Sequence, residues 1–191
     1  MNYIQGNIGL TLILSIDKSG NIKWYVDAAF AVHKDMSSHT GGFINMGTRG
    51  AYVHSRKNNL NTNISTEAEI VGVDDVLTQV IWTRYYLKEQ GYMIHDNVIY
   101  QDNQSTIRLE KNGRQSSRKS KMHINTRYYF ITDRIIKQEV SVEICPTFNM
   151  IGDYFTKALQ GSQFRRFHNI IIGIHEDDLP AYNKSGGYFF E

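Results

Sequence analysis

The sequence predicts a single α/β domain in which a mixed sheet is flanked by helices. Short apolar runs typical of strands and longer runs of helical period follow one another in the order β-β-β-α-β-α-β-α. Four acidic residues lie at the ends or core-facing positions of these elements: Asp27, Glu69, Asp102 and Asp153. The 191 residues suffice for one domain with a sizeable core.

The composition excludes several classes of protein. Hydrophobic residues make up 41% and aromatic residues 12%, which is typical of an ordered globular chain. The net charge of +2 permits nucleic-acid binding but does not argue for it. The single cysteine, Cys145, excludes an intrachain disulfide. No apolar run has membrane-spanning length and no secretory signal is present, so we expect an intracellular protein that is neither secreted nor bound to a membrane.

The N-terminal part is expected to form antiparallel strands joined by short turns. Four apolar or aromatic runs are strand candidates: residues 10–16, 22–27, 40–46 and 50–55. The last three predict an antiparallel meander. Gly41 and Gly42 indicate a bulge or a close approach of another backbone segment.

The longest helical pattern covers residues 65–90, with Ser65 or Thr66 as the expected N-cap. At about 100° per residue, five apolar side chains form a stripe that should face the sheet. They are Val73, Val76, Leu77, Val80 and Leu87. Glu69 projects at the edge of this stripe, whereas Glu67 falls on nearly the opposite side, so Glu69 is the acid expected to face the sheet.

Asp102 ends the next predicted strand, residues 97–102, and Asn103 begins what looks like the cap of a helix. Ligands of open α/β sheets bind at this carboxyl end, although Asp102 is locally explained equally well as a helix cap. Residues 111–121 carry five of the 21 Lys and Arg residues. This basic segment is either a phosphate-binding loop or a solvated linker.

The C-terminal part continues with a helix at residues 123–138 and a strand at 140–145. A helix at 154–159 should then hold Asp153 in its first turn, and a further helix is expected at 164–172.

The four acids together predict a divalent-metal site. Each acid alone is explained by a turn, a cap or a solvated helix face. A buried carboxylate is costly unless it is paired or bound to metal, however, and four of them in comparable positions require a common explanation. Carboxylates without a thiolate or His cluster suit Mg²⁺ or Mn²⁺.

Four stretches resemble the ribonuclease H domain at the C-terminal end of copia-type retrotransposon polyproteins: WYVDAAFAVHKDMSSHTGG, STEAEIVGVDD, IYQDNQSTI and NMIGDYFTKALQG. Similarity also covers KMHINTRYYFITDRI and FRRFHNIIIGI. The resemblance implies a ribonuclease H-like sheet of three antiparallel strands followed by two parallel ones. It places the domain at residues 10–175, between a remnant of the upstream connecting segment at 1–9 and a tail at 176–191.

The resemblance also implies that Asp27, Glu69, Asp102 and Asp153 are catalytic and bind two Mg²⁺ or Mn²⁺ ions. Such ions lie about 3.5–4 Å apart in two-metal enzymes. Asp27 is expected to bridge them, with Glu69 and Asp102 completing one site and Asp153 the other. Because family members differ in how the Glu of the TEAE-type motif aligns, Glu67 remains the alternative to Glu69.

The implied activity is endonucleolytic hydrolysis of the RNA strand of an RNA/DNA hybrid, leaving 5′-phosphate and 3′-hydroxyl ends. The implied partners are the hybrid and other polyprotein domains such as reverse transcriptase. Two alternatives stay open. One is a catalytically inactive nucleic-acid-binding relic of the same fold, and the other is a different two-metal nuclease or strand-transfer enzyme on this scaffold.

The candidate substrate contacts fall into three groups. Reading of 2′-hydroxyls is assigned to Gly41, Gly42, Asn103 and Gln104. Phosphate contacts are assigned to Arg114, Arg118, Lys119 and Lys121. His123 lies in a copia-type lysine-histidine pattern altered by Met122, and its default role is structural.

Overall fold

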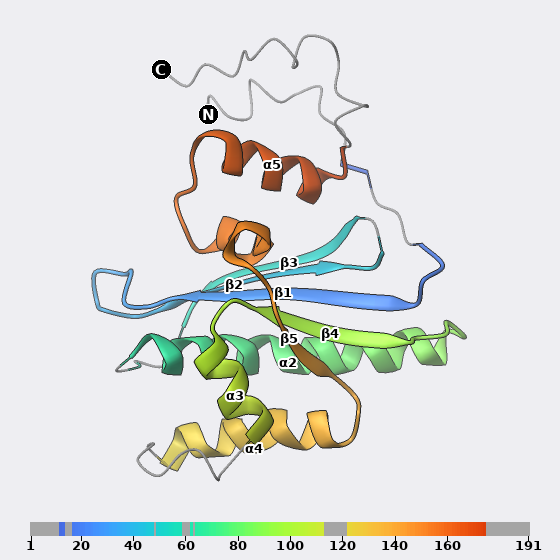
Figure 1. Cartoon of the computed structure of the whole chain (residues 1–191), viewed down its shortest axis with the longest axis horizontal. Coiled ribbons are helices and arrows are strands. Elements are labelled where there is room, and N and C mark those ends of the chain that lie inside the picture. The colour runs from blue at the N-terminus through green and yellow to red at the C-terminus, as the bar shows by residue number, and fades with distance from the viewer. Residues whose placement is uncertain are drawn as a thin grey trace.

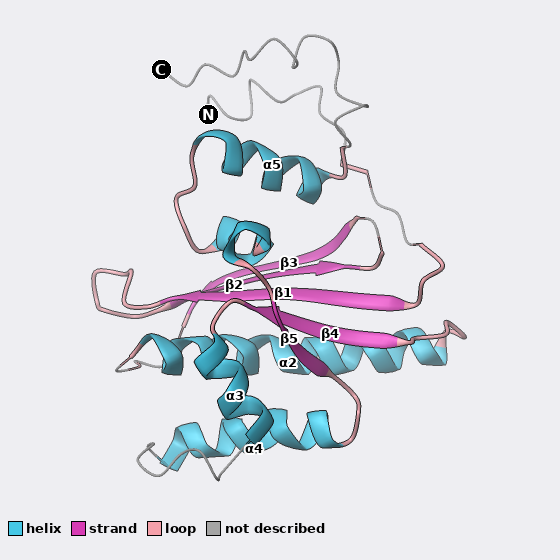
Figure 2. Ribbon diagram, viewed as in Figure 1, coloured by secondary structure: helices cyan, strands magenta, loops and turns pink. Residues whose placement is uncertain are grey.

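A computed structural model describes residues 12–13, 17–47, 49–58, 62, 64–112 and 122–174. Its centre is a five-stranded sheet with the order β3-β2-β1-β4-β5, and helices cover both faces of this sheet (Figures 1 and 2). The strands are β1 (Asn21–Ala29), β2 (His39–Asn45), β3 (Gly50–Lys57), β4 (Asp96–Gln101) and β5 (Ser141–Ile144). The β1–β2 and β2–β3 pairs are antiparallel, and the β1–β4 and β4–β5 pairs are parallel. The predicted mixed sheet is therefore confirmed.

The helices divide between the two faces of the sheet. They are α2 (Ser65–Glu89), α3 (Gln104–Asn112), α4 (Met122–Ile136), the 3₁₀ helices η2 (Thr147–Asn149) and η3 (Ile151–Phe155), and α5 (Gly161–Ile172). Figure 1 shows α2, α3 and α4 on one face, with α5 on the other. The η3 helix packs against β1 and β2 and is in turn contacted by α5.

The main core lies between the sheet and α2. Alternate residues of β1, Ile22, Trp24 and Val26, are buried against this helix, as the two-residue period of a strand requires. From α2, four residues of the predicted stripe are buried in the same cluster: Val73, Val76, Leu77 and Val80. Burial of this stripe fixes the rotation of α2, and with it the direction in which Glu69 points.

A second core lies on the opposite face, where Phe43, Ile151 and Phe167 are buried together. These three residues come from β2, η3 and α5, so this cluster holds η3 against the sheet. Tyr25 of β1 packs against the same cluster, which shows that this side chain points away from α2. Asp27, two residues further along β1, belongs to the same face.

Several predicted boundaries differ from the structure. The residue that caps α2 is Ile64, which has extended backbone and makes no side-chain cap bond, so neither Ser65 nor Thr66 has that role. The helix expected at 154–159 is wrong, because the chain forms only η3 there and then leaves helical geometry. Among residues 10–16, Leu12 and Ile13 are not in a strand, and the others lie outside the described residues.

Other expectations are met. Asn103 accepts hydrogen bonds from the backbone amides of Ser105 and Thr106, at 3.0 and 3.3 Å, and so caps α3 as predicted. All described helices and strands fall within residues 21–172. The segments 1–9 and 176–191 lie outside the described residues, and the domain boundaries stay predictions. No helix in the described part is long and apolar enough to cross a membrane.

Candidate metal centre

The parallel strands β1 and β4 diverge at their carboxyl ends and leave an open position between them. Their pairing ends at Tyr25 and Tyr100. Beyond that point β1 continues to Ala29 beside β2, while the chain after β4 turns into α3. The chain leaves β1 toward β2 on one side and leaves β4 toward α3 on the other. Ligands of α/β sheets bind at strand ends where the connections diverge in this way.

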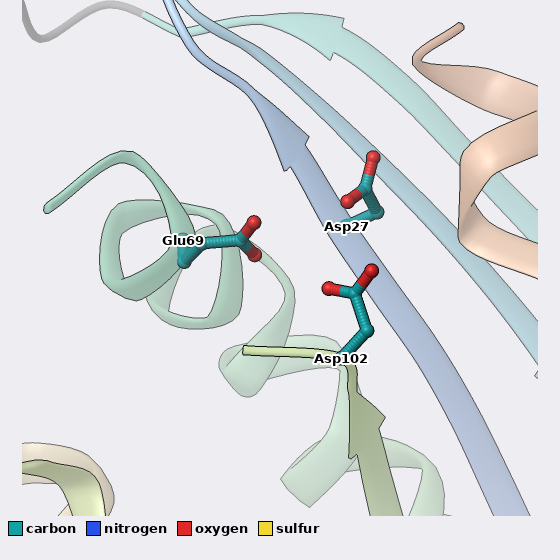
Figure 3. A group of neighbouring side chains, drawn as sticks. All are labelled: Asp27, Glu69 and Asp102. Carbon is teal, nitrogen blue, oxygen red and sulfur yellow. The ribbon is translucent and has the colours of Figure 1, made fainter. Parts of the chain in front are cut away.

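Three carboxylates meet at this position. Asp27 lies on β1 just past the last pair with β4, Asp102 directly follows β4, and Glu69 comes from the first turns of α2. One carboxylate oxygen of each lies within 4.8 Å of the others (Figure 3). Asp27 and Glu69 are buried and Asp102 is half-buried. Three negative groups at this separation repel one another unless a cation or protons compensate them.

Glu69 is the least compensated of the three. Its side chain is buried, and its Oε2 atom has no hydrogen-bond partner. Burial and the charges of Asp27 and Asp102 raise the pKa of Glu69 to about 9. A buried carboxylate with an oxygen that has no donor, grouped with two other acids, fits the role of a metal ligand.

Asp153 approaches Asp27 through η3, on the same face of the sheet as Tyr25 and Asp27. The Lys157 ammonium joins the two acids, with its Nζ 2.8 Å from Asp153 Oδ1 and 3.5 Å from Asp27 Oδ1. Burial raises the pKa of Asp153 to about 6, although the hydrogen bond from Lys157 acts in the opposite direction. Burial alone would lower the pKa of Lys157, but the hydrogen bond to Asp153 and the surrounding carboxylates raise it above its ordinary value.

Two glycines allow η3 to lie this close to the sheet. A β-carbon on Gly152 would stand 3.0 Å from the Asp27 amide nitrogen and 3.2 Å from the Tyr25 carbonyl oxygen. A β-carbon on Gly41, which pairs with Asp27 in the β1–β2 ladder, would stand 2.8 Å from the Gly152 carbonyl oxygen. The Gly41 position is thus the close backbone approach that the sequence indicated. The only described bulge on β2 is at Ile44 and Asn45 instead.

Two hydroxyl groups orient the aspartates. Thr156 Oγ1 donates a hydrogen bond to Asp27 Oδ2, and Thr147 Oγ1 donates one of 3.2 Å to Asp102 Oδ2. Partners of this kind fix the direction of ligand carboxylates and are typical of metal sites. Neither threonine was expected from the sequence. Both lie in segments of irregular or 3₁₀ structure whose contacts depend on how they dock against the sheet.

The donor set fits Mg²⁺ or Mn²⁺. The acids around the open position are all oxygen ligands. Cys145 is buried outside this cluster, and burial, together with the charge of Asp102, raises the pKa of its thiol. Hard divalent cations prefer carboxylate oxygens and retain part of their water shell. The orphaned Oε2 of Glu69 supports the same conclusion.

The candidate substrate-contact residues differ in where they lie relative to the acids. Asn103 and Gln104 follow Asp102 at the start of α3 and lie beside the acids in the chain. Gly41 and Gly42 are buried in the interior of the sheet, paired with both β1 and β3. Arg114, Arg118, Lys119 and Lys121 lie outside the described residues, as does the side chain of His123.

Comparison with known proteins identifies relatives of the chain. No protein-family model matches it. It is 26% identical over 178 residues, 93% of its length, to the retrovirus-related Pol polyprotein from transposon TNT 1-94 of Nicotiana tabacum. The Pol polyproteins from transposons RE1 and RE2 of Arabidopsis thaliana are each 28% identical over 169 residues, 87% of the chain.

The chain is thus similar in sequence to transposon Pol polyproteins. It spans only 13%, 11% and 12% of the length of these three relatives. The similarity is therefore to a small part of each polyprotein.

Solved structures that resemble the chain include a ribonuclease H1 and a viral protease-reverse transcriptase. LC11-RNase H1, isolated from compost by a metagenomic approach, is 12% identical with a TM-score of 0.48, and the match covers 67% of this chain and 86% of that one. The prototype foamy virus protease-reverse transcriptase is 8% identical with a TM-score of 0.47, and the match covers 95% of this chain and 22% of that one. The strand order and directions agree with the predicted sheet of three antiparallel strands followed by two parallel ones.

Proposed function

We propose that this chain is a two-metal-ion endonuclease that hydrolyses the RNA strand of RNA/DNA hybrids, derived from a copia-type retrotransposon polyprotein. The observation that carries the proposal is the meeting of Asp27, Glu69 and Asp102 at the diverging strand ends. Asp153 lies against the other side of Asp27 and completes the quartet. Homology to transposon Pol polyproteins supports the same function.

The side chains divide into two groups around Asp27. Glu69 and Asp102 would hold one divalent cation together with Asp27, and Asp153 would hold a second one with the same aspartate. Two such ions would supply the charge that activates a water molecule on one side of a phosphodiester and stabilises the leaving oxygen on the other. Thr156 and Thr147 keep Asp27 and Asp102 turned toward this position.

The hybrid is recognised around the rim of the acidic site. Asn103 and Gln104 stand next to Asp102 and offer amide groups that hydrogen-bond to 2′-hydroxyls, which distinguish RNA from DNA. The basic segment at 111–121 supplies phosphate contacts. The proposed substrate is the RNA/DNA hybrid that forms during reverse transcription within the cell. The chain would act on it beside the reverse transcriptase of the same polyprotein.

A nuclease assay with three substrates tests the function. The chain is incubated with an RNA/DNA hybrid, duplex DNA and duplex RNA of one sequence, in Mg²⁺ or Mn²⁺, with Asp27→Asn as the control for contaminating nuclease. We expect cleavage of the RNA strand in the hybrid alone, and loss of cleavage in the variant. Cleavage of duplex DNA would indicate another two-metal nuclease. Hybrid binding without cleavage by the wild-type chain would indicate an inactive relic.

A further inference from the structure

The Lys157 ammonium lies between two buried carboxylates of the proposed metal centre. Asp27 and Asp153 are each only 3% exposed, whereas the Lys157 side chain is 41% exposed. In the part of the chain that the structure describes, no other basic side chain forms an ion pair with either acid. Lys157 therefore provides the positive charge that allows these two carboxylates to lie together in the absence of metal.

The position of the ammonium is also where a second cation would be bound. Asp27 is shared by two arrangements: it faces Glu69 and Asp102 on one side and is joined to Asp153 through Lys157 on the other. A cation that bridges Asp27 and Asp153 needs the oxygen atoms that Lys157 contacts. Both Oδ1 atoms are engaged by the same Nζ.

Lys157 can leave this position without unfolding the site. It follows η3 at a point where the chain has left helical structure, and its side chain reaches the acids from the surface. An ammonium on a four-carbon stem regains rotamer freedom and hydration when it moves into water. Its displacement requires no proton transfer, because the group stays charged in both positions.

We propose that Lys157 is a built-in counterion that holds Asp27 and Asp153 together in the metal-free protein, and that the second divalent ion has to displace it. The inference rests on the metal site of the proposed function. It predicts ordered loading: the ion at Asp27, Glu69 and Asp102 binds first, and the ion at Asp27 and Asp153 binds more weakly because it competes with an ammonium.

A second ion pair in the molecule provides a matched control. Lys137 and Asp133 have the same i,i+4 spacing as Lys157 and Asp153, and the same distance of 2.8 Å. Asp133, however, is 44% exposed, and the pair lies at the end of α4. Exposed pairs of this kind contribute little to stability, so Lys137→Met removes a comparable contact without uncovering buried charge.

The test compares wild type, Lys157→Met and Lys137→Met by thermal unfolding and by calorimetric titration with Mn²⁺. In chelator, we expect Lys157→Met to unfold at a clearly lower temperature than wild type, and saturating Mn²⁺ to close this gap. We expect the second Mn²⁺ ion to bind about tenfold or more tightly to Lys157→Met, because a competing charge a few ångströms away has been removed. Lys137→Met should match wild type in both measurements.

Lys157→Arg keeps the test decisive if Lys157→Met does not fold. Arginine preserves the charge and holds carboxylates through a fork of donors, so the second ion should bind this variant no more tightly than wild type. Unchanged affinity in Lys157→Met, an equal loss of stability with and without Mn²⁺, or tighter binding to Lys157→Arg would each overturn the counterion role while leaving the metal site intact. Absence of any Mn²⁺ binding to wild type would overturn both the inference and the proposed function.

Discussion

Asp27 faces Glu69 across the open end of the sheet, and after burial its charge is the largest cause of the raised pKa of Glu69. A carboxyl group with a pKa raised from 4.5 to about 9 keeps its proton in the folded state at pH values where the unfolded chain has lost it. Its contribution to stability is therefore complete below the unfolded pKa and is lost as the pH rises to about 9.

This relationship predicts that the metal-free protein loses stability as the pH rises from about 4.5 to about 9. Asp153, with its pKa raised to about 6, contributes in the same direction over the lower part of this range. Urea unfolding in chelator at several pH values measures the effect. Glu69→Gln, which cannot ionise, should flatten the dependence above pH 6. A slope identical to that of wild type would show that Glu69 ionises freely in the folded state.

Glu69 and Glu67 should differ in their importance for cleavage. We expect Glu69→Gln to be inactive and Glu67→Gln to remain largely active, because Glu69 is the one grouped with Asp27 and Asp102. Initial rates on the hybrid in Mg²⁺, with circular dichroism as a control for folding, decide the question. The opposite pattern would make Glu67 the ligand and would contradict the placement of α2.

Asp102→Asn should abolish hybrid cleavage without loss of the fold. The substitution removes a charge that a metal ion needs but keeps nearly the same volume, and Thr147 can still donate its hydrogen bond to the amide oxygen. Because repulsion with Glu69 and Asp27 is relieved, the metal-free variant should be at least as stable as wild type. Single-turnover rates and urea unfolding of matched preparations measure both effects. Cleavage at the wild-type rate would exclude Asp102 from the site.

Gly41→Ala should destabilise the protein by about 1–3 kcal/mol, as overpacking of a tight interior does. Its β-carbon would lie within 3 Å of Gly152, Phe155 and Thr156, so η3 would have to move away from β2. Gly42→Ala is the control, because its β-carbon would meet only side-chain atoms of Val76 and His54, at 3.3 and 3.4 Å. Urea unfolding should show the larger loss for Gly41→Ala, and equal losses would contradict the close approach of η3.

The features that could be predicted from the sequence are those that depend on the regular period of helices and strands. The apolar stripe of α2 is long enough to fix the rotation of the helix, and Glu69 follows from that rotation. Asp27 and Asp102 follow from the ends of two strands, because parallel strands bring their carboxyl ends to one edge of the sheet. These three acids could therefore be brought together from the amino-acid sequence alone.

The contacts around Asp153 could not be predicted from the sequence. They depend on how η3 packs against the sheet and not on the period of a helix or strand. A regular helix was expected there, whereas Gly152 and Gly41 let a short 3₁₀ helix press against β1 and β2. This docking brings Thr156 and Lys157 to Asp27, 129 and 130 residues away in the sequence. No local pattern encodes contacts of that range. The missing side-chain cap of α2 is a similar case, since burial of its stripe and not its first turn holds the helix.

The basic segment provides the last prediction. Neutralising Arg114, Arg118, Lys119 and Lys121 together should weaken binding of hybrid and duplex DNA alike, because phosphate contacts position a nucleic acid without reading its sequence. The acids lie in other elements, so cleavage at saturating hybrid should survive.

Binding of labelled hybrid at several salt concentrations measures the effect. For each phosphate that the variant no longer neutralises, the slope of log affinity against log salt should flatten by about 0.9. A variant in which the exposed Lys18, Lys34, Lys88 and Lys137 are all changed to Gln loses the same four charges in other segments and provides the control for net charge alone. If the four-residue variant kept the wild-type slope and affinity, the segment would be a solvated linker. The substrate-holding charges would then have to be sought nearer Asp153, with Arg165, exposed on α5, as the first to test.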